Sequence, residues 1–285
     1  MPTTSGIPRP LVVFGLGLAG LLAALYWTIL RDLGRQWMND ANYGHGFLVP
    51  LFSAFLLWQR RDRLAAVVPV GSRVGLLVVL AGVGILLLGD VAGESFLART
   101  SLIVILAGLV LFHLGPAALR LTAFPLAFLV FMVPLPATLL YAITFPLQRL
   151  AATNAAWFLD LLGIPVLLDG NIIHLSQISL GVTEACSGIR SLISLVAGAV
   201  AWAYFMLPGG WMSVIFVLAA VPITILANAG RVVATGIIGQ WLGVEYAAGF
   251  FHDLAGWVVY LLAFGCLAGV HGLLDLVRRR RGARR

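Results

Sequence analysis

The hydrophobic positions of this chain form long runs, separated by short polar or glycine-containing segments. Several runs approach the ~20 apolar residues that a helix needs to cross the hydrocarbon core of a bilayer. We therefore predict an all-α polytopic membrane protein with about eight transmembrane helices, in one membrane-embedded domain covering residues 1–285. The expected spans are residues 11–30, 46–58, 74–89, 102–114, 121–133, 189–207, 211–229 and 254–277.

Two segments depart from the pattern of simple spans. Residues 137–160 are apolar but are interrupted by polar side chains such as Gln148 and Asn154, which indicates an interfacial or re-entrant segment. Residues 164–183 contain the turn sequence Asp169-Gly170-Asn171 followed by alternating apolar and polar positions. This pattern predicts a short extracytoplasmic β-hairpin.

The charged residues indicate how the spans are oriented. The chain is 61% hydrophobic and 10% charged, which leaves no room for a separate soluble domain, and its net charge of +7 comes from arginines. These arginines gather in residues 60–73, at Arg120 and in the tail after Val277. Eight spans with both termini in the cytoplasm put all three groups inside, as the positive-inside rule requires. The tail is then a cytoplasmic anchor near acidic membrane lipid, and no nucleic-acid partner is expected.

Three reactive side chains are expected at the same outer level of the membrane. From Cys186 to Arg231 is 45 residues, enough for one span inward, a turn and one span back at ~1.5 Å per residue. Between Arg231 and His252, the glycine-rich residues 232–251 suit a surface or re-entrant excursion better than a crossing. A thiol, a guanidinium and an imidazole thus meet outside the cytoplasm.

These three groups are suited to acyl transfer. A thiolate is a nucleophile, and its pKa falls beside an imidazolium or at a helix N-terminus. Arg231 can donate to a developing oxyanion, and His252 can take the thiol proton and return it to a leaving amine. Each residue alone has a structural explanation, as a small buried hydrophobe, a helix-end anchor or an interfacial imidazole. Their convergence, with Glu184 and Asn228 nearby, favours a catalytic site.

Four segments in order resemble the signatures of the exosortases, within the exosortase and archaeosortase group of membrane cysteine transpeptidases. They are Tyr43-Gly-His-Gly-Phe-Leu-Val-Pro50 with the following Leu56-Leu-Trp-Gln-Arg-Arg61, Glu184-Ala-Cys-Ser-Gly-Ile-Arg190, Asn228-Ala-Gly-Arg231 and His252-Asp-Leu-Ala-Gly-Trp257. The resemblance covers almost the whole chain.

The resemblance implies a sorting enzyme of a Gram-negative inner membrane, with its active site on the periplasmic side. Its partners would be exported proteins that end in a Pro-Glu-Pro motif, one transmembrane helix and an arginine-rich tail. Cys186 would attack the peptide near the motif, Arg231 would assist the carbonyl, and His252 would handle protons. A second molecule would resolve the thioester, and water, lipid and glycan all stay open as that acceptor. No cofactor is implied.

Several further residues are candidates for supporting or substrate-binding roles. Glu184 can pair with Arg190 or Arg231, or receive the substrate's motif. His45 lies between two glycines that permit close backbone approach. Ser187 is a competing nucleophile without a paired base. The histidines do not form a metal-binding pattern.

Two functions of other classes remain as alternatives. The first is a polytopic transporter, whose intramembrane charges would mark a substrate path. The second is a membrane acyltransferase that uses Cys186 on a lipid donor. The molecule trapped on Cys186, whether protein, lipid or nothing, distinguishes them.

Overall fold

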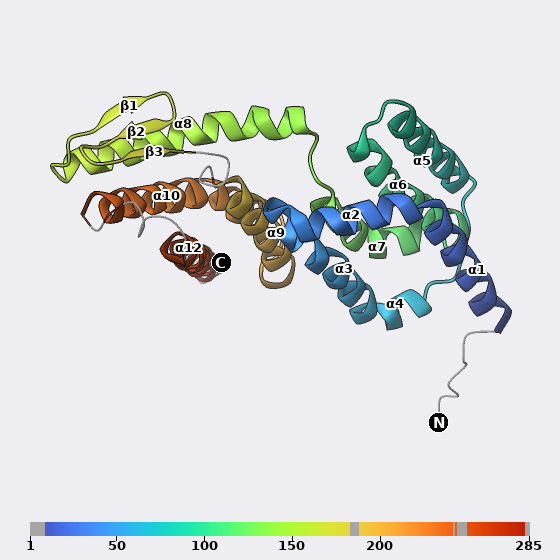
Figure 1. Cartoon of the computed structure of the whole chain (residues 1–285). Coiled ribbons are helices and arrows are strands. Elements are labelled where there is room, and N and C mark those ends of the chain that lie inside the picture. Colours follow the sequence, from blue (N-terminus) through green and yellow to red (C-terminus); the bar gives the residue numbers. More distant parts are fainter. Residues whose placement is uncertain (1–8, 183–187, 242, 244–249, 283–285) are drawn as a thin grey trace. The chain divides into compact units, whose positions relative to one another are not determined.

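The computed structural model describes residues 9–182, 188–241, 243 and 250–282, which are mostly helical (Figure 1). The predicted all-α polytopic fold is confirmed. The chain divides into two compact units between Pro136 and Ala137.

The first unit consists of helices only, in the part that the structure describes. They are α1 (Arg9–Leu25), α2 (Trp27–Asn39), η1 (Ala41–Phe47), α3 (Leu48–Gln59), α4 (Arg61–Ala65), α5 (Val74–Val91), α6 (Ser95–His113), α7 (Pro116–Phe128) and η2 (Leu129–Met132). The second unit adds a small sheet. Its elements are α8 (Ala137–Leu161), β1 (Leu167–Asp169), β2 (Ile172–His174), β3 (Ser179–Gly181), α9 (Ile189–Met206), α10 (Trp211–Trp241) and α12 (Phe250–Gly282).

Five of the described helices are long and apolar enough to cross a membrane, namely α5, α6, α9, α10 and α12. Two bent pairs raise the number to seven if each counts as one span: α1 with α2, at 69°, and α7–η2 with α8, at 76°. These match seven of the eight predicted spans. The eighth, expected at residues 46–58, is α3, whose 12 residues reach only ~18 Å. The bend before α8 suits the interfacial or re-entrant segment expected there.

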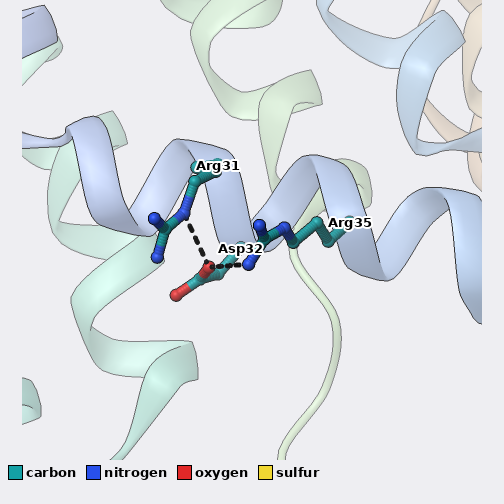
Figure 2. A network of polar contacts seen from close by, with 3 residues as sticks. All are labelled: Arg31, Asp32 and Arg35. Atoms are coloured by element: carbon teal, nitrogen blue, oxygen red, sulfur yellow. Dashed lines mark hydrogen bonds and ion pairs between the residues drawn. The ribbon is translucent and has the colours of Figure 1, made fainter.

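The first predicted span is broken at Tyr26. This side chain is buried, and its hydroxyl lies 2.7 Å from Ser101 Oγ of α6. Beyond the bend, α2 is amphipathic: Leu33 is buried, whereas Trp27 is 65% exposed. Asp32 lies between Arg31 and Arg35 (Figure 2), with N···O distances of 3.3 and 3.9 Å. A helix with separate apolar and charged faces is typical of the membrane interface.

Helices α5 and α6 pack closely because glycines line their contact. Gly75, Gly82 and Gly89 recur every seven residues on the buried face of α5. A Cβ on Gly89 would lie 2.6 Å from the backbone nitrogen of Ala98, and one on Gly75 would overlap the backbone of Phe112. Small residues at such positions let two membrane helices approach at backbone distance.

The predicted hairpin is confirmed as part of a three-stranded antiparallel sheet. Strands β1 and β2 pair Asp169 with Ile172, around the two-residue loop Gly170-Asn171. Gly170 has a φ of +60°, which only glycine adopts without strain. The third strand, β3, pairs with β2 and ends the sheet next to the region of Cys186.

Helix α10 is the centre of the second unit, because it packs against α8, α9 and α12. Its first half shares a buried apolar cluster with α9 and α12, which includes Phe216 and Leu267. Its last turns join a second cluster with α8 and the sheet, which includes Val232 and Leu159. Figure 1 shows α8 and α10 running in the same direction, with the sheet beside their C-terminal ends.

The first ten residues of the segment predicted as a surface or re-entrant excursion, 232–241, continue α10 as a helix to Trp241. The glycines that suggested a break serve the packing instead. A Cβ on Gly236 would lie 3.3–3.5 Å from the side chains of Leu159, Leu180 and Leu175. The cost of a glycine within a helix, about 1 kcal/mol, is offset by this close contact.

Replacement of Gly75 by valine should destabilise the first unit. A side chain there meets the backbone of Phe112, which cannot move as a side chain can, and overpacking typically costs about 1–3 kcal/mol. Gly84→Val on the same helix is the matched control, because nothing lies within 4 Å of its Cβ position. Thermal unfolding of both variants in detergent, followed by size-exclusion chromatography, measures the difference. Equal melting temperatures would contradict the close α5–α6 packing.

Candidate active site

The start of α9 lies directly on α10. Gly188 is the residue before the helix, with a φ of +80°, and it is buried together with Ile189. A Cβ on Gly188 would come within 3.0 Å of Asn228 Cγ. Asn228 is itself only 4% exposed. Glycine is therefore required at this position for two reasons, its backbone conformation and the side chain packed against it.

The strand that precedes the Cys186 motif is anchored in the same unit. The Val182 nitrogen donates to the Asn171 carbonyl over 2.8 Å, and Asn171 Nδ2 donates back to the Val182 carbonyl over 3.0 Å. Val182 is buried in the apolar cluster that contains Val232 of α10. Residues 183–187 thus connect two fixed points, and both belong to structure around residues 228–232 of α10.

Arg231 follows Asn228 by three residues, slightly less than one helical turn. It lies within α10 rather than at the end of the helix. Its Nε is buried, and a Cβ on Gly256 of α12 would lie 3.6 Å from its Cζ. Arg231 is twenty residues after Trp211, where α10 begins. This rise of ~30 Å equals the thickness of the hydrocarbon core. The guanidinium lies beside α12, at Gly256.

The structure describes part of the predicted catalytic set. His252 lies in α12 one helical turn before Gly256, and its side chain is outside the described residues. Cys186, Glu184 and Ser187 also lie outside them. The described residues that come together are Asn228 with Gly188 and Arg231 with Gly256. The described parts of three of the four motif segments therefore meet along α10.

The fourth motif segment belongs to the first unit. His45 Nε2 donates to the Phe131 carbonyl over 3.2 Å, and the Tyr43 hydroxyl accepts from the Leu135 nitrogen over 3.0 Å. Burial lowers the pKa of His45 below its ordinary value, and the hydrogen bond to Phe131 partly opposes this effect. Near neutral pH the imidazole is therefore favoured in its uncharged form. Both residues fasten η1 to the chain around η2.

One further arginine, Arg190, and the second cysteine, Cys266, are both exposed. Arg190 lies in the first turn of α9 and points out of the buried contact made by Gly188. Cys266 is exposed on α12, because the buried stripe of that helix passes through Ala263 and Leu267 instead. In the described part of the chain, no group of three or more metal-ligating side chains occurs.

Comparison with known families shows which family the chain belongs to. A family model described as transmembrane exosortase matches residues 37–269, which is more than four-fifths of the chain and includes all four motif segments. The chain belongs to the transmembrane exosortase family. No curated protein and no solved structure matches it.

Two buried polar residues of α8 were not among the predicted site residues. Thr144 and Gln148 are 1% and 9% exposed. Gln148 was noticed in the sequence only as an interruption of an apolar run. The spacing contained a further signal: Thr144 and Gln148 are four residues apart, as are Thr224 and Asn228 of α10, so each pair lies on one helix face.

Replacement of Gly188 by alanine should impair both folding and function. Alanine in the left-handed region costs about 1–2 kcal/mol, and here its Cβ would also press on Asn228. Gly163→Ala separates the two effects, because Gly163 has a similar φ of +77° with nothing within 4 Å. Melting temperatures and substrate processing should fall further in Gly188→Ala than in Gly163→Ala. Equal losses would mean that the Asn228 contact is unimportant.

Proposed function

We propose that this exosortase is a membrane cysteine transpeptidase that cleaves the C-terminal sorting signal of exported proteins through a thioester on Cys186. The observation that carries the proposal is the anchoring of both ends of residues 183–187 around one segment of α10. Cys186 is two residues before Gly188 in the sequence. Gly188 in turn contacts Asn228, one turn from Arg231.

Helix α12 supplies the other side of the proposed site. Gly256 borders the Arg231 guanidinium, and His252 precedes it by four residues, a spacing that keeps two positions on the same helix face. Chain connectivity and helix geometry thus favour Cys186, Arg231 and His252 as one constellation. The family to which the chain belongs supports a transpeptidase role over a transporter.

In the proposed reaction, His252 accepts the Cys186 proton and the thiolate attacks the carbonyl carbon of the scissile peptide bond. The carbonyl oxygen becomes negatively charged, and the Arg231 guanidinium donates hydrogen bonds to it. When the C–N bond breaks, His252 returns the proton to the departing amine. The remaining thioester is then attacked by a second nucleophile, which releases the thiol.

The substrates are proposed to be exported proteins with a Pro-Glu-Pro motif, one transmembrane helix and an arginine-rich end. Such a signal has the same order as α12, whose apolar length ends in Arg278, Arg279 and Arg280. A parallel substrate helix would bring its motif to the level of His252. The arginine distribution favours cytoplasmic termini and a periplasmic site in the inner membrane.

Replacement of Cys186 by alanine or serine should abolish processing while the protein remains in the membrane. A serine hydroxyl lacks the acidity of the thiol and does not replace it. Cys266→Ala is the matched control, because that side chain is exposed on α12. Mass spectrometry of a substrate's C-terminus, with and without each variant, distinguishes hydrolysis, transfer and inactivity. Full processing by Cys186→Ala would disprove the proposed mechanism.

Replacement of Arg231 by lysine should cause a severe defect although the positive charge is kept. An oxyanion needs the planar, multiple donors of a guanidinium, and loss of one such donor commonly costs on the order of a hundredfold in rate. Arg149→Lys, at an exposed position of α8, controls for the exchange itself. A time course of cleavage at matched expression gives the rates. Near wild-type cleavage by Arg231→Lys would reduce this residue to a helix-end anchor.

A further inference from the structure

The buried face of α8 changes character along its length. Its C-terminal half presents small apolar side chains, including Ala151, Ala155 and Leu159, to the cluster shared with α10 and the sheet. Its N-terminal half presents Thr144 and Gln148 on the same face, both as buried as the alanines. In a membrane protein, a buried polar side chain without a hydrogen-bond partner lowers stability, because no water is present to hydrate it.

The Thr144 hydroxyl is buried and has no hydrogen-bond partner in the part of the chain that the structure describes. The buried and half-buried threonines of the neighbouring α10 bond to their own helix, whereas Thr100 Oγ1 of α6, in the first unit, is like Thr144 in having no partner among the described residues. Thr224 Oγ1 donates to the Ala220 carbonyl over 2.7 Å, and Thr235 Oγ1 donates to the Arg231 carbonyl over 3.0 Å. An unsatisfied buried hydroxyl costs roughly 1–3 kcal/mol. Thr144 therefore differs from its neighbours in keeping its hydrogen-bonding capacity unused.

The polar half of α8 begins about one helical turn from the level of Asn228 in the proposed active site and extends away from it toward the start of α8. Leu159 contacts the Gly236 position of α10, and the two helices run in the same direction (Figure 1). Gln148 is eleven residues before Leu159, or ~16 Å at the helical rise. Asn228 is eight residues before Gly236, or ~12 Å. Gln148 thus lies within about one turn of Asn228, and Thr144 lies one turn further into the membrane.

We propose that Thr144 and Gln148 bind the peptide main chain of the sorting signal beside the scissile bond. The inference rests on the proposed function. An extended peptide at this depth carries N–H and C=O groups that water cannot satisfy. A Gln side-chain amide matches a peptide group, since it can accept from the N–H and donate to the C=O together. The Thr144 hydroxyl adds one more donor and acceptor on the same face of α8.

A purely structural role for the two side chains predicts a different outcome. If Gln148 and Thr144 joined α8 to its neighbours, their removal would destabilise the free enzyme. If they serve the peptide, replacing the unpaired Thr144 hydroxyl by a methyl group should leave the free enzyme equally stable or more stable. Affinity for the peptide and stability of the enzyme should therefore change independently.

The test uses the full-length Cys186→Ala enzyme, which cannot turn over, in lipid nanodiscs. The probe is a synthetic peptide with a Pro-Glu-Pro motif, an apolar helix and an arginine-rich end. Thr144→Val and Gln148→Leu should each weaken binding roughly three- to tenfold, the loss of one or two hydrogen bonds, without lowering the melting temperature. Thr144→Ser should retain affinity. Thr224→Val is the control, because that hydroxyl is bonded to its own helix.

Several results would overturn the inference. They are unchanged affinity in both variants, an equal loss in Thr224→Val, a parallel fall in melting temperature, or no binding of the peptide by the parent enzyme. Failure of the proposed function is seen separately, as the absence of Cys186-dependent cleavage by the wild-type enzyme. Cleavage with unchanged affinity in both variants would leave the transpeptidase standing and remove only the role of α8.

Discussion

The contact between Gly188 and Asn228 is the constraint on which the second unit depends. It places the start of α9 against α10 so closely that a Cβ at residue 188 would press on the Asn228 side chain. Gly188 enters the helix with a positive φ. Hydrogen bonds between Val182 and Asn171 hold the residue that follows β3 in the same unit.

Helix α10 is long because it packs against two different sets of elements. Its first twenty residues cross the apolar core, packed on α9 and α12 through Phe216 and Ala220. Its last ten residues, after Arg231, pack on α8 and the sheet through Val232. Arg231 thus lies where packing on α9 and α12 gives way to packing on α8 and the sheet. A long guanidinium is tolerated at such a boundary, because its stem is apolar and its head is held among protein groups.

Buried polar side chains in the second unit concentrate at the same level. Among the described residues they are Thr144, Gln148, Thr224 and Asn228. An apolar core would be the cheaper arrangement for stability alone, because each buried polar group must recover its lost hydration. Thr224 is satisfied by its own helix, so the side chains left to receive a polar chain, such as a peptide, are Thr144, Gln148 and Asn228.

Much of the architecture was predictable from the sequence. Apolar run length indicated the membrane class, the alternation around Gly170 indicated the hairpin, and residue counts placed His252 near the start of the last helix. These are local or additive properties, since a run or a turn is encoded by neighbours in the chain. The glycines of α10 were misinterpreted because a glycine looks the same in sequence whether it breaks a helix or lets another one approach.

The sequence by itself therefore determined that the chain is a membrane protein, which of its residues can do chemistry, and the order in which they occur. Only the tertiary structure decided that α10 extends to Trp241, that Asn228 packs on Gly188, and that Gln148 of α8 is buried at the same level. The physical reason is that burial depends on which distant segment covers a side chain. Helical periodicity specifies a face, but the partner of that face is chosen by packing across the whole unit.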